Sequence, residues 1–159
     1  MPLTQGYRLS HDPAELQLDV IHAYLSRSYW SPGIPFHAVE RAVAHSLTVA
    51  VFDPTGAQVG FARMVTDQAS FGYLSDVFVL EALRGRGLAR AMVRALLDRP
   101  EIRDCRTLML LTQDAHGVYE ACGYQRVQDP GPFMQILRPG HYPQAPAGAA
   151  EPARPEAAD

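Results

Sequence analysis

The sequence predicts one mixed α/β domain, of the α+β kind, followed by a short tail. Three β-rich segments joined by short turns occupy the middle of the chain, and a helix with a clear apolar stripe separates them from a further apolar strand. A helix between two strands of one sheet implies a right-handed crossover that makes those strands parallel neighbours, so the sheet is expected to be mixed. The length of 159 residues suits a single hydrophobic core.

The N-terminal part predicts one short strand and two helices. The strand is expected over residues 4–9. Asp12 and Pro13 provide an N-cap and a first-turn proline, which predicts a helix over residues 13–27. After a loop that contains prolines and aromatic residues, a second short helix is expected over residues 36–45.

The middle of the chain predicts an antiparallel meander of three strands. The strands are expected over Leu47–Phe52, Gln58–Thr66 and Phe71–Leu80. Residues 53–56 and 67–70 are rich in Asp, Pro, Gly and Ser, which favours tight turns between these strands.

Two further helices and two further strands follow the meander. A helix over Gly87–Asp98, ended by Pro100, carries an apolar stripe at helical spacing: Leu88, Ala91, Met92, Ala95 and Leu96. An apolar strand is expected over Arg106–Thr112. Asp114 is expected to cap a short helix that runs to Cys122, and a last strand is expected over Phe133–Leu137.

The composition narrows the class of protein. The formal net charge of −3 does not point to nucleic acid or an anionic membrane as a partner. No apolar run approaches the roughly 18 residues of a membrane span, and the N-terminus lacks the pattern of a secretory signal, so a cytoplasmic location is expected. Cys105 and Cys122 are expected to be reduced thiols, and no Cys/His cluster has the spacing of a metal site.

The composition changes sharply at Pro139. The 21 residues of 139–159 include five Pro and seven Ala, too little apolar surface to offset the entropy of ordering. We therefore predict a folded domain over residues 1–138 and a disordered, dispensable tail over residues 139–159.

A cluster of arginines and glycines joins the third meander strand to the helix that follows. The chain contains no Lys, and all 14 positive side chains are Arg. Arg84, Gly85, Arg86 and Gly87 stand directly before the predicted helix, where free backbone N–H groups and the helix dipole favour a phosphate group. The pattern is neither a Walker loop nor a dinucleotide fingerprint, because the Walker lysine and a third glycine are missing.

Two motifs of the sequence resemble the GNAT acetyltransferase superfamily. Arg84-x-x-Gly87-x-Ala89 resembles the superfamily signature Q/R-x-x-G-x-G/A, and it follows a strand that looks like the fourth strand of that fold. Glu81 stands where the superfamily usually has proline. The second motif, from Ala115 through Tyr119, Gly123 and Tyr124, resembles the segment N-x-x-A-x-x-x-Y-x-x-x-G-F, with Thr112 in the place of Asn.

The resemblance implies a fold and a co-substrate. The fold would be a mixed, mostly antiparallel central sheet of six to seven strands, flanked by about four helices, with a bulge in the fourth strand. The co-substrate would be acetyl-CoA. The residues that would contact it are Val77, Phe78, Val79, Arg84, Gly85, Arg86, Gly87, Leu88, Ala89, Thr112 and Ala115.

The resemblance also implies catalytic roles. Tyr119 occupies the position of a general acid that protonates the departing thiolate. Asp76 is the first candidate for the base that accepts the proton of the amine, although it could equally be a hydrogen-bonded strand residue. Glu81 and His116 are weaker candidates for proton transfer.

The acceptor is expected to be a small-molecule amine. Tyr29 and Trp30 lie in the proline-rich loop that would line its site, and Trp30 could serve either as a lid or as an anchor of that loop. The loop carries no acidic cluster, which argues against polyamines and histone-like tails. A homodimer is possible. An acyl-CoA-binding sensor without catalysis is the alternative of the same fold, and a nucleotide-binding regulator is a third hypothesis.

Overall fold

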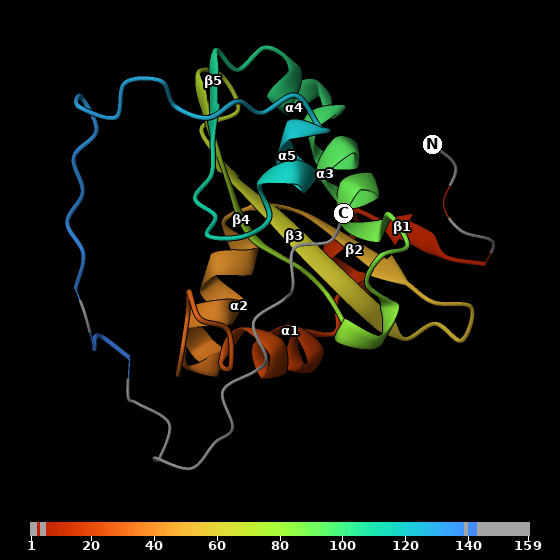
Figure 1. Ribbon diagram of the computed structural model, residues 1–159. Helices are drawn as coiled ribbons and strands as arrows, with labels where there is room; N and C mark the ends of the chain where they lie inside the picture. Colours follow the sequence, from red (N-terminus) through yellow and green to blue (C-terminus); the bar gives the residue numbers. More distant parts are fainter. Residues whose placement is uncertain (1–2, 4–5, 139, 143–159) are drawn as a thin grey trace.

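The computed structural model describes residues 3, 6–138 and 140–142, and their fold is built around one five-stranded sheet (Figure 1). The strands lie side by side in the order of the sequence: β1 (Arg8–Ser10), β2 (Leu47–Phe52), β3 (Gln58–Thr66), β4 (Phe71–Val79) and β5 (Thr107–Met109). The first four are antiparallel to their neighbours, and β5 is parallel to β4. The predicted mixed, mostly antiparallel sheet is confirmed.

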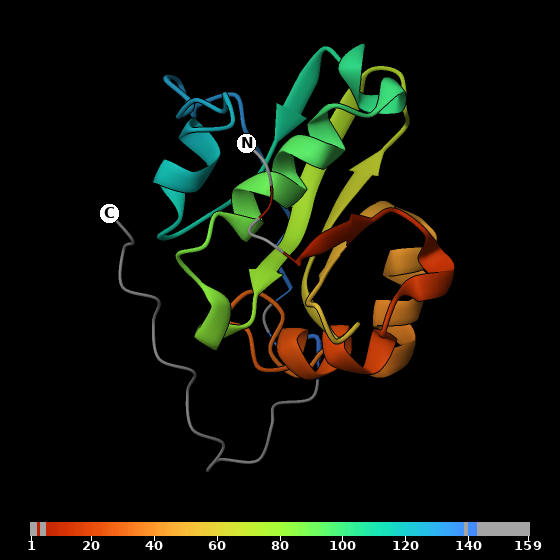
Figure 2. The same cartoon turned by 90° about the vertical axis from the view of Figure 1, so that its right-hand side faces the viewer.

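Helices cover both faces of this sheet. They are α1 (Leu18–Leu25), α2 (Phe36–Ala44), α3 (Leu88–Leu97), α4 (Pro100–Arg103) and α5 (His116–Glu120), with short 3₁₀ turns at Pro13–Glu15 and Glu81–Leu83. Figures 1 and 2 show α1 and α2 on one face and α3 with α5 on the other. In the described residues, no helix is both long and apolar enough to cross a membrane.

Each face of the sheet has its own hydrophobic core. The predicted apolar stripe of α3 places Met92 and Leu96 against buried strand residues such as Val49, Met64 and Leu74. On the opposite face the buried cluster joins α1 and α2 to β3 and β4, through Ile21, Leu25, Val39, Phe61 and Phe78. Full burial of side chains of this size stabilises a fold by about 1.5–3 kcal/mol each.

A bulge interrupts β4, as expected for the fourth strand. The register between β3 and β4 shifts between Phe61 and Arg63, so that two residues of β4 oppose Ala62. Asp76 lies at this bulge with a left-handed backbone, φ 55°. The bulge reverses the alternation of side chains, and Leu74 and Phe78 therefore pack into opposite cores although they are four residues apart.

The two parallel strands separate towards their carboxyl ends. β4 and β5 are paired only from Phe71–Thr107 to Tyr73–Met109, while β4 continues to Val79. Figure 1 shows β4 and β5 close together at one end and diverging at the other. The backbone of β4 beyond Tyr73 therefore has no strand partner on its β5 side.

Two predicted elements of the N-terminal part differ from the structure. The strand predicted over 4–9 is β1 at Arg8–Ser10, with residues 4 and 5 outside the described residues, and the helix predicted over 13–27 is a 3₁₀ turn followed by α1. The break has a clear cause at Gln17, whose backbone N–H donates to the side-chain oxygen of Gln58 (2.7 Å) while its own side chain accepts from the Gln58 N–H (3.0 Å). These bonds fix Gln17 to Gln58, the first residue of β3, and interrupt the helix.

The predicted last strand is wrong. Residues 133–137 form no strand, and the sheet of the described residues has five strands instead of six to seven. The side chains of this segment are exposed, up to 98% for Met134. The apolar pattern was compatible with a strand, but a strand also needs a neighbouring strand that pairs with its backbone. None of the five described strands pairs with residues 133–137.

Smaller differences occur around α5. The strand predicted over 106–112 is shorter in the structure. It is β5, Thr107–Met109, and these are the residues that pair with β4. Asp114 does not cap α5, which begins at His116 with Ala115 as its N-cap and without a side-chain cap. Instead the hydroxyl of Thr112 accepts a hydrogen bond from the N–H of Ala115 (3.1 Å).

The predicted tail is described only in part. Residues 139 and 143–159 lie outside the described residues, so the disordered tail stays a prediction for them. Within residues 140–142, Tyr142 packs against the core cluster of α1 and α2. This aromatic contact lies beyond the predicted boundary at Arg138.

The contact of Tyr142 gives the first test. Tyr142→Ala should lower the free energy of unfolding by about 1–2 kcal/mol, because a half-buried ring is removed, and should lower Tm by about 2–8 °C. A chain shortened to end at Tyr142 should keep the parent Tm within a few degrees. Thermal unfolding followed by circular dichroism measures both, and a parent-like Tm for Tyr142→Ala would contradict the packing role.

Candidate active site

The N-terminus of α3 presents backbone donors that no side chain caps. Its N-cap is Gly87, with φ 74° and no side-chain cap bond, and Gly85 also has a positive φ of 75°. A Cβ atom added to either glycine would have no heavy atom within 4 Å, so the turn is open on that side. The first N–H groups of a helix have no carbonyl partner inside it, so they are available to an anion.

The Arg84 side chain holds this turn in place. Its Nη2 donates to the hydroxyl of Tyr24 (2.9 Å), and its Nε donates to the carbonyl of Val79 (3.4 Å). The exposed carboxylate of Glu81 lies 3.7 Å from the same Nη2. The guanidinium is thus bonded to α1, to the end of β4 and to the 3₁₀ turn, which fixes the start of the glycine segment.

Side chains around the bulge and the α3 N-terminus belong to the core. Phe78, Val79 and Leu88 are buried, and Val77 and Ala89 pack against the α3 core. These predicted contact residues can therefore reach a ligand mainly through their backbone. On the β5 side, the backbone of Val77 to Val79 is not paired with a strand.

The carboxylate of Asp76 is held by partners on both oxygens. Arg63 Nε donates to one oxygen at 2.5 Å, and the indole N–H of Trp30 donates to the other at 3.1 Å. Arg63 also donates to the hydroxyls of Ser46 (3.1 Å) and Ser75 (3.3 Å). Because Asp76 is buried, protonating it would leave the Arg63 cation without its counter-charge. This geometry favours the positioning role of Asp76 over the role of a base.

Tyr73 lies beside this ion pair. Burial raises the pKa of the Tyr73 phenol, and the negative charge of Asp76 acts in the same direction. The positive charge of Arg63 and a backbone hydrogen bond from Leu111 oppose the shift. Tyr73 therefore connects the network at the bulge to the chain that follows β5.

A row of aromatic rings crosses from α1 to the loop after β5. Tyr24 stacks on Phe78, with ring centroids 3.9 Å apart and planes 8° apart, and its ring lies 6.2 Å from that of Trp30. Tyr29 meets Trp30 edge to face at 4.9 Å. The hydroxyl of Tyr29 accepts a hydrogen bond from the N–H of Gln113 (3.4 Å). The row spans the carboxyl ends of the two parallel strands.

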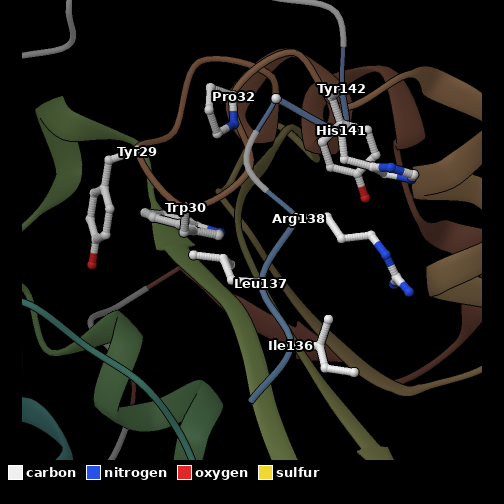
Figure 3. A pocket seen from close by; sticks show the side chains of 9 residues that line it. Tyr29, Trp30, Pro32, Ile136, Leu137, Arg138, His141 and Tyr142 are labelled. Carbon is white, nitrogen blue, oxygen red and sulfur yellow. The ribbon is translucent and has the colours of Figure 1, made fainter.

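A pocket of about 460 Å³ adjoins this aromatic row. Figure 3 shows Tyr29, Trp30 and Pro32 on one side and the C-terminal segment on the other, with Leu137 directed towards Trp30. Trp30 is 38% exposed although its N–H is bonded to Asp76, so it both anchors the loop and lines the pocket. Among the described residues, none that lines the pocket carries a carboxylate.

Tyr119 lies on α5 beside Tyr124, with ring centroids 6.2 Å apart. Burial raises the pKa of Tyr119 well above its usual range, and the neighbouring phenols of Tyr29 and Tyr124 act in the same direction. Tyr119 is therefore neutral and carries its proton at neutral and moderately alkaline pH. The proximity of Tyr29 places Tyr119 next to the aromatic row.

One buried donor lies between α3 and α5. The Nε of Arg90 is buried and has no hydrogen-bond partner in the described part of the chain. The thiol of Cys122, which lies just after α5, donates a long hydrogen bond to the carbonyl of Arg90 (3.9 Å). An unsatisfied guanidinium donor near the α3 N-terminus is compatible with an anionic ligand.

Sequence reasoning missed Arg63, Tyr24 and Tyr73. Arg63 carried a usable signal, because it is a charged residue inside the apolar strand Gln58–Thr66. Tyr24 falls within the helix predicted over residues 13–27, and nothing in its spacing pointed to Arg84. Among the described residues, no group of three or more His, Cys, Asp or Glu could hold a metal ion.

Comparison with known proteins gives one consistent result. The model of the Acetyltransferase (GNAT) family matches residues 10–124. A Gibberella zeae protein named "Putative acetyltransferase" is 36% identical over 135 residues, which cover 70% of this chain and 75% of that protein. A crystal structure of a Xanthomonas campestris protein with the same description is 38% identical, with a TM-score of 0.83, over 90% of this chain and all of the other (100%).

More distant structures share the fold alone. Glucosamine-6-phosphate N-acetyltransferase from Arabidopsis thaliana is 14% identical, with a TM-score of 0.58, and the match covers 83% of this chain and 97% of that protein.

The buried ion pair gives the second test. Asp76→Asn keeps a residue that tolerates the left-handed backbone and should lower the free energy of unfolding by on the order of 3 kcal/mol, because Arg63 loses its counter-charge. With Arg63→Gln in a double-mutant cycle, the coupling energy should reach about 1–3 kcal/mol in urea unfolding.

The exposed pair of Arg8 and Glu15, 2.8 Å apart, is the matched control. The same cycle there should give a clearly smaller coupling, because solvent screens an exposed pair. Equal coupling at the two pairs would show that burial does not strengthen the pair at the bulge.

Proposed function

The chain belongs to the acetyltransferase (GNAT) family, and on this premise we propose that it transfers an acetyl group from acetyl-CoA to the primary amine of a small molecule. The observation that carries the proposal is the uncapped glycine turn at the start of α3, directly beyond a bulged strand whose end is open towards β5. A thioester co-substrate with a long arm and a pyrophosphate suits such a combination of slot and anion site.

The residues present fit this co-substrate. The N–H groups of the segment from Gly85 to Ala89 would hold the pyrophosphate, and the unsatisfied Nε of Arg90 supports a high density of negative charge nearby. The backbone of Val77 to Val79 would pair with the pantetheine arm along the open side of β4. Thr112 keeps an O–H that can donate to the arm while its oxygen accepts from Ala115. When bound, acetyl-CoA supplies an acetyl group activated as a thioester.

Tyr119 would act as the general acid. Its raised pKa keeps the phenol protonated at neutral pH. Because a phenol of raised pKa gives up its proton less readily, it would act mainly by donating a hydrogen bond to the sulfur as negative charge develops there, and its proton would pass to the thiolate as that group departs. Such assistance contributes typically about 10²–10⁴ in rate.

Deprotonation of the amine would not rely on Asp76. Both of its oxygens are bonded, and its carboxylate instead fixes Trp30 at the edge of the acceptor pocket. We therefore propose that water in the pocket accepts the proton of the amine. Keeping an amine of pKa about 10.4 neutral at pH 7 costs about 4–5 kcal/mol, so an acceptor amine of lower pKa would react faster.

The pocket beside Trp30 supports a small acceptor. Its volume of about 460 Å³ suits a small molecule. Its described lining residues include aromatic and aliphatic side chains, and Arg138 is the one among them with a permanent charge. These described residues offer a polyamine no carboxylate, whereas a small amine with an apolar body would contact Tyr29 and Trp30.

Calorimetry tests the co-substrate. Acetyl-CoA and CoA should bind with micromolar Kd, more weakly as salt is added, and ATP and NAD should bind far more weakly. Gly87→Val should weaken CoA binding at least tenfold, because a bulky residue fills the phosphate turn and strains its backbone.

Gly56→Val is the matched control for Gly87→Val. Gly56 also has a positive φ and open space around it, but it lies in the turn between β2 and β3. Its substitution should leave CoA binding unchanged. Binding of ATP as tight as that of acetyl-CoA would refute the proposal, and tight CoA binding with no transfer to any amine in a panel would favour the acyl-CoA sensor.

Substitution of the proposed acid tests the mechanism. Tyr119→Phe should retain acetyl-CoA binding and lower kcat by about 10- to 10³-fold, since water replaces the acid only in part. Tyr124→Phe removes the neighbouring buried hydroxyl, which has no partner in the described residues, and should leave kcat nearly unchanged. Because the pKa of Tyr119 is raised, kcat/KM should not fall between pH 7 and about 10 through loss of its proton. A full kcat for Tyr119→Phe would exclude the acid role.

A further inference from the structure

Tyr24 belongs to neither of the sequence motifs, yet it contacts both sides of the candidate site. We propose that Tyr24 is a positioning residue that holds Arg84, and through it the phosphate-binding turn, and that couples this turn to Trp30 in the acceptor pocket. The proposal rests on the proposed function, because it assigns the turn to CoA and the pocket to the acceptor amine.

The first contact joins α1 to the phosphate-binding turn. The Tyr24 hydroxyl accepts a hydrogen bond from Arg84 Nη2 at 2.9 Å, across 60 residues of sequence. Figures 1 and 2 both show α1 next to the 3₁₀ turn at Glu81–Leu83 that leads into this segment. Since Arg84 also donates to the carbonyl of Val79, its side chain points towards the fold and braces the turn. The uncapped N-terminus of α3 follows this braced turn.

The second contact fixes the ring of Tyr24. The ring is stacked on Phe78, nearly parallel and 3.9 Å away, and Phe78 is buried in the core directly after the bulge. The opposite neighbour of Tyr24 is Trp30, at 6.2 Å. A shift of the Tyr24 ring would therefore have to move Phe78 or change the surroundings of Trp30.

These contacts predict that CoA and the acceptor amine affect each other's affinity. CoA bound at the turn would restrain Arg84 and, through the hydrogen bond, the Tyr24 hydroxyl. The Tyr24 ring would then restrain the neighbouring indole of Trp30, which lines the pocket. By linkage, an acceptor that binds against Trp30 must change the affinity for CoA by the same factor. The chain offers its own probe of this coupling, because Trp30 is its single tryptophan and its fluorescence reports on that position alone.

Two substitutions separate the hydroxyl of Tyr24 from its ring. Tyr24→Phe removes the bond to Arg84 and keeps the stack, so the Kd for CoA and the KM for acetyl-CoA should rise about 3- to 10-fold. Its acceptor KM and its kcat should stay within about twofold, and its Trp30 emission without ligand should match the parent. Tyr24→Leu also removes the ring, so the emission of Trp30 should shift and the acceptor KM should rise as well.

Fluorescence titration with CoA distinguishes a positioning role from a purely structural one, because only a positioning role predicts that Tyr24→Phe changes the response of Trp30 emission to CoA. In the parent, CoA should change the Trp30 emission, and in Tyr24→Phe at saturating CoA that change should be smaller by at least half. Tyr7→Phe is the control for loss of a tyrosine hydroxyl, because Tyr7 packs against the α3 core on the other face of the sheet, and it should behave as the parent.

The outcomes distinguish the two proposals. If the parent binds CoA and Tyr24→Phe binds it equally well with an unchanged emission response, the role of Tyr24 is refuted and the proposed function stands. If CoA does not bind to the parent at all, the proposed function fails and the role of Tyr24 fails with it. A lower Tm for Tyr24→Phe with parent-like Kd and emission would identify a structural residue only.

Discussion

The left-handed backbone at Asp76 is the constraint on which the candidate site depends. Most residues avoid a positive φ, and Asp is one of the few that tolerate it. Here the conformation is held from outside, because Arg63 and Trp30 each bond one oxygen of the buried carboxylate. A neutral residue at this position would leave the half-buried Arg63 cation without its counter-charge. The bulge is thus stabilised by electrostatics and packing together, and not by the strand propensity of β4.

The bulge has two consequences for the architecture. It shifts the alternation of β4, so that Leu74 faces the core under α3 and Phe78 faces the core of α1 and α2. It also lies where β4 has already lost its pairing with β5, so the strand end has no partner strand on that side. The uncapped N-terminus of α3 follows this strand after one short turn. This arrangement suits the elongated, anionic co-substrate proposed above.

The aromatic row gives the same region its second wall. Tyr24, Trp30 and Tyr29 come from α1 and the loop after it, and they connect the turn at Arg84 to the loop at Gln113. The row lies across the carboxyl ends of β4 and β5, where open α/β sheets generally bind their ligands. Aromatic side chains suit this place because they provide large, rigid contact areas with few rotatable bonds. The polar ends of Tyr24 and Trp30 fix their rings to Arg84 and Asp76.

The meander β2–β3–β4 and the apolar stripe of α3 were predictable from the sequence, because both depend on local periodicity. The glycine turn before α3 was predictable as well, because it depends on the backbone freedom of Gly85 and Gly87. The motifs of the sequence also led to the acetyltransferase family. Only the tertiary structure decided that Asp76 is paired with Arg63, that Tyr24 bonds Arg84 and that residues 133–137 form no strand. Each of these depends on which groups, distant in the sequence, come within bonding distance. Spacing along one segment carries no information about its partner, and so a carboxylate that looked free to accept a proton is bonded on both oxygens in the folded chain.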